Sequence, residues 1–370
     1  MKKIFLARPC IGEEEVEAVK KVLSSKFLTE GPVTNEFERE FAKYCEANHG
    51  IATTSCSTAL ELSLRTLNIG KGDEVIVPDF TYPVTASVVS LVGAEPVLVD
   101  VDLDDCNVTR EKIEEAISEK TKAVIPVSLF GNPLQEDVYR VKRAHSLYII
   151  EDAACSVGAM LNGRKVGSQA DMTCFSLHPR KIITTGEGGM ITTNDKELAE
   201  RARSLKRFGI REVNGQLCFA EIGTNYKMSD ILAAIGLVQL QKVEDIIKDR
   251  IEKAKIYTEY LSRINGIRPP RVRPGTRHTF QSYVCYIEKE GLRDKLRIRL
   301  AERRIETQIG TYALHLQPAF KKAKKVGDLK NSEKLFNNLI TLPLHGELTA
   351  DDIGEICKSI KAIVRETAYT

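Results

Sequence analysis

A lysine followed by closely spaced glycines is the most reactive feature of the sequence. Lys181 lies in SLHPRKIITTGEGG (residues 176–189), just after the apolar run MTCFSL, and the glycines of GEGG follow it. A lysine at the end of a buried strand is costly unless its charge is partnered or its pKa falls, and a desolvated amine is what imine formation with a carbonyl requires. Glycines let the backbone pass close to a bound group. The pattern therefore predicts covalent chemistry with a carbonyl compound at Lys181.

A second candidate feature is the start of a helix after the strand GIATTS. In TSCSTAL, Ser55 and Ser57 stand where a helix is predicted to begin at about residue 57. A helix N-terminus presents unpaired backbone N–H groups, and the two hydroxyls add donors suited to a phosphate. Taken alone, these serines are explained better as an ordinary helix cap.

Two further strand ends carry an aromatic pair and a carboxylate pair. Phe80 and Tyr82 occur in PDFTYPVT, and one of them could stack on a planar ligand, although aromatic residues at such places are more often core. Glu151 and Asp152 end the most apolar predicted strand, and either could simply cap the next helix. Ligands of open α/β sheets bind at the carboxyl ends of strands, so these side chains are expected near Lys181.

Together these features match the requirements of one cofactor, pyridoxal 5'-phosphate. Its aldehyde forms a Schiff base with a lysine, its ring nitrogen pairs with an acid, and its ring and phosphate need an aromatic side chain and N–H donors. Other cofactors match less well, because no GxGxxG follows a strand and the glycines come after the lysine, whereas a Walker loop has them before it. The cysteines and histidines show no spacing typical of a metal site.

The elements that must position these residues predict an α/β fold. Between about residues 50 and 193, β-branched runs alternate with segments of helical periodicity, which is typical of a mostly parallel sheet covered by helices on both faces. Two amphipathic helices precede this region, and long helices follow it at 195–206 and 229–263. The predicted strands are GIATTS, EVIVP, EPVLVDV, AVIPVSL and LYIIED.

The length of 370 residues favours two domains, because a single core rarely grows beyond roughly 300 residues. We predict a large cofactor-binding domain over residues 1–245, including the N-terminal helices, and a smaller C-terminal α+β domain over 246–370. The Pro- and Arg-rich stretch 264–278 interrupts the helical periodicity and is a candidate boundary element. The basic run KKAKK (321–325) is predicted to be a solvated helix face.

Composition argues against nucleic-acid and membrane partners. Lys and Arg number 54 against 51 Asp and Glu, and the charges are interspersed. No apolar run approaches the ~18 residues of a membrane span, and the N-terminus does not read as a signal peptide. Nine scattered cysteines without a CxxC pair suggest reduced thiols, so a cytoplasmic location is expected.

Longer segments resemble the DegT/DnrJ/EryC1/StrS family, the nucleotide-sugar aminotransferases of the aspartate aminotransferase fold (PLP-dependent transferase fold type I). The resemblance covers nearly the whole chain and is most specific at the lysine segment. It implies that Lys181 forms the Schiff base, that Asp152 pairs with the ring nitrogen and that Tyr82 stacks on the ring. The matching segments are RPCIGEEEVEAVKKVLSSKFLTEGPVTNEFEREFAKY, GDEVIVPDFTYPVTA, VLVDVD, IIEDAA, CFSLHPRKIITTGEGGMITTND and NYKMSDILAAIGLVQL.

The same resemblance implies a phosphate site shared between two subunits. Cys56, Ser57 and Ser176 would supply phosphate donors, and Asn225 in GTNYKMS would reach the phosphate from the partner subunit of a homodimer. Cys56-Ser57 stands where the family often has Gly-Thr, and Cys155 stands where it often has Gln or His. No role is assigned to Cys155.

The reaction implied by the resemblance is amino transfer from an amino acid, with glutamate as the expected donor, to a keto group of a nucleotide-linked sugar. Family members that deoxygenate the sugar instead have a histidine in place of the lysine, and a non-catalytic regulatory protein on this fold should have lost the lysine or the aspartate. Lys181 and Asp152 are both present, which favours transamination.

Candidate substrate residues come from the same comparison. Arg271, Arg273 and Arg277 could meet the diphosphate, although each is equally well explained as an exposed basic residue. The other candidates are histidines and a tyrosine that match substrate-facing regions or lie near the lysine: His178, His278, Tyr312 and His315.

Overall fold

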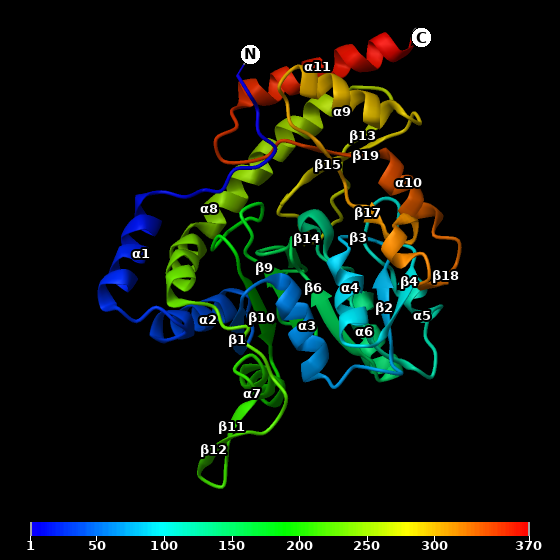
Figure 1. Cartoon of the computed structure of the whole chain (residues 1–370). Coiled ribbons are helices and arrows are strands. Elements are labelled where there is room, and N and C mark those ends of the chain that lie inside the picture. The colour runs from blue at the N-terminus through cyan, green and yellow to red at the C-terminus, as the bar shows by residue number, and fades with distance from the viewer. Residues whose placement is uncertain (1, 369–370) are drawn as a thin grey trace.

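An eight-stranded sheet forms the centre of the computed structural model, which describes residues 2–368 (Figure 1). The strand order is β1-β10-β9-β6-β5-β2-β4-β18, and β10 alone runs antiparallel to its neighbours. The predicted α/β fold with a mostly parallel sheet is therefore confirmed. The strands are β1 (His49–Thr53), β2 (Glu74–Pro78), β4 (Glu95–Val99), β5 (Thr121–Val124), β6 (Tyr148–Asp152), β9 (Met172–Ser176), β10 (Gly189–Thr193) and β18 (Lys324–Val326).

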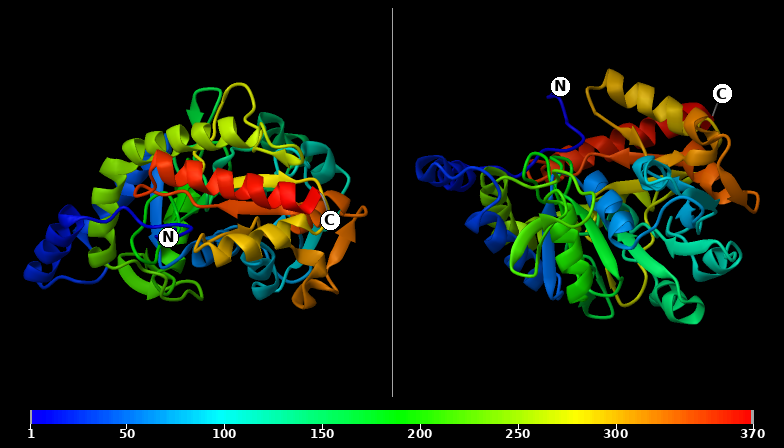
Figure 2. Two further views of the ribbon diagram at one scale, coloured as in Figure 1. Left: turned by 90° about the horizontal axis from the view of Figure 1, so that it is seen from above. Right: turned by 60° about the horizontal axis from the view of Figure 1, so that its bottom comes forward.

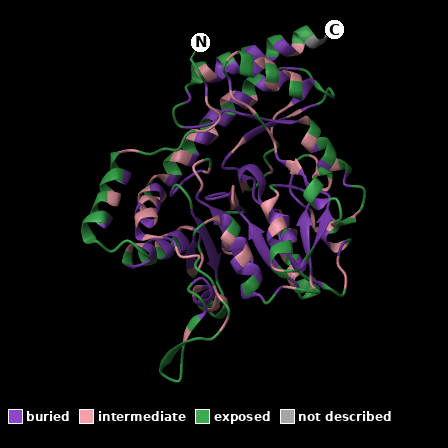
Figure 3. Cartoon of the chain, viewed as in Figure 1, coloured by how far each residue is buried: buried purple, intermediate pink, exposed green. Residues whose placement is uncertain are grey.

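Helices cover both faces of this sheet because alternate strand residues point to opposite sides. In β2, Val75 and Val77 pack in one hydrophobic cluster with α3 (Cys56–Thr66), α4 (Val84–Leu91) and α7 (Lys196–Leu205). Ile76 packs on the other side with α5 (Arg110–Glu114) and α6 (Glu136–His145). Figure 3 shows the strands buried between these helices.

A second hydrophobic cluster forms around a smaller sheet with the order β13-β15-β19-β16. Long helices pack against it, and α8 runs beside α11 (Figure 2). None of the helices among residues 2–368 has the length and apolar character needed to cross a bilayer. The elements are β13 (Ile267–Arg268), β15 (Tyr283–Ile287), β19 (Leu339–Leu342), β16 (Gln308–Ile309), α8 (Asp230–Leu261), α9 (Leu292–Glu302) and α11 (Ala350–Ala368).

The chain passes several times between the unit built on the large sheet and the unit built on the smaller sheet, whereas a single boundary after residue 245 would allow one passage. That boundary falls inside the continuous helix α8, and Ile4 forms a β-bridge with Ile305 in the smaller unit. In the opposite direction, β17 (Tyr312–Ala313) pairs with β3 (Phe80–Thr81), and β18 extends the large sheet. The predicted division into residues 1–245 and 246–370 therefore needs correction, because strand pairing joins residues that lie far apart in the sequence.

The prediction that the basic run 321–325 forms a solvated helix face is also wrong. Lys324 and Lys325 lie in β18 rather than on a helix, and Lys324 Nζ is 2.7 Å from Glu74 Oε1. Tertiary pairing with β4 gives this run an extended conformation despite its charge.

The remaining elements lie around these two sheets. The N-terminal helices α1 (Glu13–Ser25) and α2 (Pro32–Tyr44) pack on α8, and a hairpin of β11 (Ile210–Val213) and β12 (Gln216–Phe219) projects from the body (Figure 1). The shorter elements are β7 (Met160–Leu161), β8 (Arg164–Lys165), β14 (Thr276–Arg277), α10 (Lys330–Asn338) and the 3-10 turns Leu129–Gly131, Leu314–Leu316 and Pro318–Phe320.

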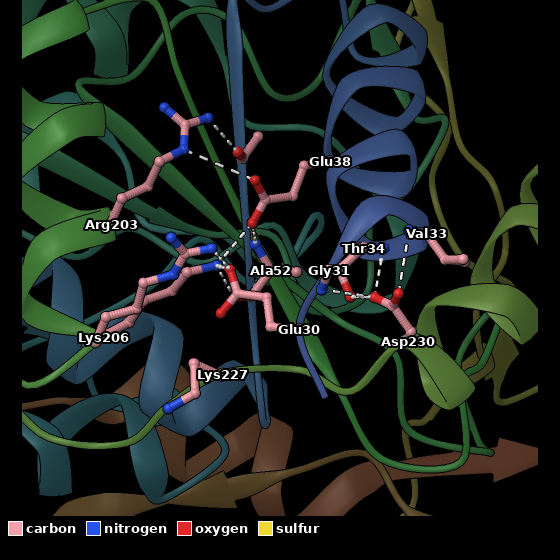
Figure 4. Close-up of polar contacts among 12 residues, drawn as sticks. Glu30, Gly31, Val33, Thr34, Glu38, Ala52, Arg203, Lys206, Lys227 and Asp230 are labelled. Atoms are coloured by element: carbon pink, nitrogen blue, oxygen red, sulfur yellow. Dashed lines mark hydrogen bonds and ion pairs between the residues drawn. The ribbon is translucent and has the colours of Figure 1, made fainter. Parts of the chain in front are cut away.

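A buried lysine joins α7 to α2 and β1 (Figure 4). The Lys206 side chain is fully buried, and its Nζ lies 2.9 Å from Glu30 and 2.7 Å from Glu38, and donates to the Ala52 carbonyl at 2.9 Å. The Lys206 carbonyl in turn accepts from the Tyr226 N–H at 3.1 Å. This cluster therefore fixes the position at which the hairpin segment leaves and rejoins the body.

Candidate active site

Lys181 lies in a loop at the carboxyl edge of the large sheet. The chain leaves β9 at Ser176, turns through residues 177–188 and returns as β10. The loop is closed by a hydrogen bond from the Leu177 N–H to the Gly188 carbonyl at 2.9 Å, and the Lys181 N–H donates to the His178 carbonyl at 2.9 Å. Inside this loop, Lys181 Nζ donates to Cys155 Sγ at 3.2 Å.

Asp152 ends β6, the neighbour of β9, and its carboxylate is buried beside the lysine. Its Oδ2 accepts from Thr85 Oγ1 at 2.9 Å, and its Oδ1 accepts from the Ala154 N–H at 3.1 Å. Burial raises the pKa of Asp152, and the two hydrogen bonds and the charge of Lys181 offset only part of that rise. Thr85 was not predicted from sequence. Its place in the first turn of α4, just after Tyr82, is the only signal that could have suggested it.

The Lys181 amine is partnered in this arrangement. Burial lowers the pKa of Lys181, but the contact with Cys155 and the nearby Cys56 and Asp152 outweigh that effect, so the pKa is raised. Of the two sequence expectations, a partnered charge or a lowered pKa, the structure supports the first. Cys155, to which no role was assigned, is the hydrogen-bond partner of the amine.

Glu151 points to the opposite side of the sheet from Asp152. Its carboxylate accepts from Ser128 Oγ and, at 2.9 Å, from Tyr139 OH. Full burial raises the pKa of Glu151 to about 7, against the lowering effect of these two hydroxyls. Successive strand residues alternate in direction, so only one of the two acids lies beside Lys181.

The raised pKa of Glu151 predicts a pH-dependent contribution to stability. Between pH 4.5 and about 7 the folded state holds a proton that the unfolded state has lost, so stability falls as pH rises through this range. We expect the wild type to lose up to about 3 kcal/mol relative to Glu151→Gln across it. Denaturant unfolding of both proteins from pH 4.5 to 8 measures this, and a constant difference between them would contradict it.

The N-terminus of α3 lies where β10 begins. The Ser55 hydroxyl accepts from the Thr58 N–H at 3.1 Å, so it already caps the helix in this structure. Cys56 is buried, whereas Ser57 is exposed in the first helical turn. The groups that face outward for a phosphate are therefore the Ser57 side chain and first-turn N–H groups rather than the Ser55 hydroxyl.

Gly189 makes this close approach of β10 and α3 possible. A Cβ at this position would lie 2.4 Å from the carbonyl carbon and oxygen of Ser55, and 2.7 Å from the backbone nitrogen of Cys56. The last glycine of GEGG is therefore required by the crossing of two backbone segments.

Gly189→Ala should weaken both folding and phosphate binding. The added methyl meets backbone rather than a movable side chain, so α3 must shift, and we expect a loss of about 1–3 kcal/mol. We also expect at least a tenfold weaker uptake of pyridoxal phosphate, measured by absorbance titration. The control is Gly354→Ala in α11, where an added Cβ meets nothing within 4 Å. Equal behaviour of the two variants would contradict the prediction.

The arrangement fits pyridoxal phosphate on the features that the structure shows. A lysine amine and a buried carboxylate lie at one edge of the sheet. At the same edge, Gly189 of β10 lets the strand pass close to the start of α3, an 11-residue helix. Among residues 2–368, no group of His, Cys, Asp and Glu side chains could hold a metal ion.

Comparison with known proteins assigns the family. The model of the DegT/DnrJ/EryC1/StrS aminotransferase family matches residues 9–361. The chain belongs to this family. The expected enzyme class, an aminotransferase, is thereby confirmed.

Named relatives and solved structures match this aminotransferase over nearly its full length. It is 38% identical over 368 residues to GDP-perosamine synthase of Caulobacter vibrioides, covering 98% of each chain. It is 35% identical over 381 residues to UDP-4-amino-4-deoxy-L-arabinose–oxoglutarate aminotransferase of Shewanella sediminis, covering 97% of each. The PMP form of Streptococcus pneumoniae Spr1654 superposes with a TM-score of 0.94 at 30% identity, over 100% of this chain and 99% of that one. Its PLP form gives 0.93, over 99% of each.

In the aminotransferase, the predicted substrate residue Tyr312 lies beside Tyr82, and His315 is bound to an acid that follows β2. The Tyr82 side chain is 64% exposed, and its ring centroid lies 6.3 Å from that of Tyr312, because β17 pairs with β3. His315 is held by Asp79, which accepts from its backbone N–H at 2.8 Å and lies 2.7 Å from its Nδ1. Sequence reasoning missed Asp79, which directly follows β2 and is fully buried.

The arginine candidates are engaged with carboxylates elsewhere. Arg271 Nη1 lies 3.1 Å from Asp104, and Arg273 pairs with Asp105. Arg277 Nη2 lies 2.6 Å from Glu244. The structure therefore gives each of them an acidic partner that is remote in sequence, and brings none of them into contact with Lys181.

The three remaining candidates contact residues other than Lys181 and Asp152. They are His278, His178 and Asn225. His278 is buried and stacks on Phe280, and burial lowers its pKa to about 3, so it is a neutral core residue rather than a solvent-facing ligand. His178 Nδ1 accepts from the Arg180 N–H at 3.2 Å within the loop. Asn225 is exposed, and its Oδ1 accepts from Lys227 Nζ at 2.7 Å.

Proposed function

We propose that this enzyme moves an amino group from an amino acid, expected to be L-glutamate, to the keto group of a nucleotide-linked sugar with pyridoxal 5'-phosphate as cofactor. The observation that carries the proposal is the Lys181 amine beside the buried Asp152 carboxylate, at a sheet edge where α3 begins. Further support comes from the family and from two relatives named for GDP- and UDP-linked amino sugars.

When bound, pyridoxal phosphate would supply a ring that accepts the electrons left when the substrate Cα loses its proton. Lys181 would hold the cofactor through its Nζ and, once released, would carry a proton to and from the substrate Cα. Asp152 would face the ring nitrogen, and Thr85 and the Ala154 N–H keep its carboxylate in one orientation. The exposed Tyr82 ring would cover the cofactor, with Ser57, Cys56 and Ser176 around its phosphate.

We further propose a homodimer in which Asn225 of one subunit completes the phosphate site of the other. Support comes from residues 210–222, the hairpin of β11 and β12 with the residues that follow it, which project from the body and expose large apolar side chains. Leu217 is 78% exposed, Phe219 73% and Ile222 93%. Exposed apolar side chains on a projecting element are typical of surfaces that a partner covers. A cytoplasmic location stays a prediction from the cysteine pattern.

An absorbance spectrum of the purified protein, before and after adding glutamate, tests the function. We expect a band at ~410–430 nm that glutamate converts to one near ~330 nm, because the lysine-bound cofactor becomes its amino form. A protein that takes up no pyridoxal phosphate and does not respond to glutamate would overturn the proposal. After a positive result, keto-sugar nucleotides are screened as amino acceptors.

A further inference from the structure

Two glutamine side chains from other parts of the chain hold the Lys181 loop at its backbone. Gln281 Nε2 donates to the Arg180 carbonyl at 2.8 Å, and the Thr184 N–H donates to Gln239 Oε1 at 3.3 Å. One contact lies a single residue before Lys181, and the other lies three residues after it. Together they bracket the reactive side chain.

The contacts of each amide fix its orientation, because Gln239 Nε2 faces a carbonyl and a carboxylate, and Gln281 Nε2 faces the Arg180 carbonyl, all of which only accept. Gln239 is 1% exposed, and its Nε2 donates to the Cys10 carbonyl at 2.6 Å and to Glu15 Oε1 at 2.8 Å. Gln281 is 9% exposed, and its Oε1 accepts from Ser282 Oγ at 3.1 Å. A buried amide whose oxygen and nitrogen are both bonded has one favourable orientation. Gln281 is thus the donor to the loop, and Gln239 is the acceptor.

Both glutamines are tied to α8. Gln239 lies on this helix, and Arg250, also on α8, fixes the backbone of Gln281 by donating to the Phe280 carbonyl at 2.9 Å and the Gln281 carbonyl at 2.6 Å. The two α8 positions are about 16 Å apart along the helix axis, from the rise per residue. A single rigid helix therefore sets the position of the loop on both sides of Lys181.

We propose that Gln281 and Gln239 are positioning residues for Lys181, which keep its Nζ beside Cys155 and Asp152. Ile182 and Ile183 are buried, and the loop has internal hydrogen bonds such as that from the Thr185 N–H to the Leu177 carbonyl at 3.0 Å. Those bonds shape the loop, whereas the two glutamine contacts tie its backbone to other parts of the chain. Such positioning has large effects, since a displacement of about 1 Å can slow a reaction roughly 100-fold. The effect on turnover rests on the proposed function, whereas the effect on the reactivity of the amine does not.

The first test uses the protein freed of pyridoxal phosphate. Gln281→Met and Gln239→Leu keep much of the side-chain volume and remove the amide. Labelling of Lys181 by an acylating reagent is followed across pH by peptide mass spectrometry. Burial lowers the pKa of Lys181, but its neighbours raise it by more, so an amine that a loosened loop exposes to solvent should return toward its ordinary, lower pKa. We therefore expect labelling at least threefold faster, with its midpoint at lower pH. Thermal unfolding of each variant checks that it is folded.

The second test adds pyridoxal phosphate. We expect both variants to form the borohydride-trappable lysine adduct at least tenfold more slowly than wild type, and kcat with glutamate to fall more than KM changes. Asn194→Leu is the matched control, because its exposed amide donates to the Ser168 carbonyl at 2.8 Å beyond the far end of β10. This control should behave as wild type in both tests.

Folded variants with wild-type labelling rate and pH midpoint would overturn the inference, whatever their turnover. If Gln281→Met does not fold, Gln281→Asn gives the same test, because its amide is one methylene too short to reach the Arg180 carbonyl. A wild type that takes up no pyridoxal phosphate would overturn the proposed function, and the labelling experiment would still decide the role of the glutamines.

Discussion

Lys181→Ala should abolish amino transfer while the protein remains folded. Removing the amine takes away both the covalent attachment of the cofactor and the group that carries the proton, which together are expected to slow turnover by more than about 1000-fold. Folding should survive, because Asp152 keeps its hydrogen bonds from Thr85 and the Ala154 N–H, and the loop keeps its backbone hydrogen bonds. Multiple-turnover assays with glutamate, and thermal unfolding, measure the two effects.

Borohydride reduction identifies the lysine directly. The wild type should gain the mass of reduced pyridoxal phosphate on the peptide containing Lys181, and the alanine variant should not. The control is Lys196→Ala, which removes a lysine from the first turn of α7, outside the candidate site. An active Lys181→Ala enzyme, or a label on another lysine, would contradict the assignment.

Lys206→Met should be the most destabilising single substitution among those considered. The Lys206 side chain is fully buried, while Glu30 and Glu38 each keep less than a tenth of their side-chain surface exposed. Removing one partner of a buried ion pair leaves uncompensated charge, which typically costs about 3–5 kcal/mol. Nearby Arg207 retains its contact with Glu30 at 2.9 Å and should limit the loss at that carboxylate. Denaturant unfolding at pH 7 measures the change.

A surface lysine provides the comparison for Lys206. Lys20 pairs with Glu17 at 3.0 Å on the exposed face of α1, and exposed pairs of this kind contribute little to stability. Lys20→Met should therefore unfold close to the wild-type midpoint. If Lys206→Met cost no more than Lys20→Met, the buried cluster would not be holding α7, α2 and β1 together.

Long matching segments of the sequence already determined the family, and the alternation of strands and helices determined the α/β fold. The order of the candidate residues along the chain indicated the cofactor and the candidate lysine. The strand that precedes Lys181 and the strand that ends at Asp152 were predictable because buried parallel strands read as short, continuous apolar runs. Their convergence was also predictable, since carboxyl ends of parallel strands meet at one edge of the sheet.

The tertiary structure decided what depends on contacts between distant residues. Strand position alone left Glu151 and Asp152 equivalent, and the family resemblance favoured Asp152. The packing of α6 and α4 on opposite faces of the sheet gives the physical reason, because each helix supplies a hydroxyl to one of the two acids. Tertiary packing also decided between the two aromatic residues, because Phe80 is fully buried whereas Tyr82 is exposed.

Charge neutralisation and loop positioning were invisible in the sequence for the same physical reason. Arg273 looked like a free cation until folding placed Asp105 against it, and Gln281 carried no motif at all until folding placed its amide on the Arg180 carbonyl. Local periodicity reports which face of an element is buried. The partners of Arg273 and Gln281 lie more than a hundred residues away in the sequence, and only the folded structure brings them together.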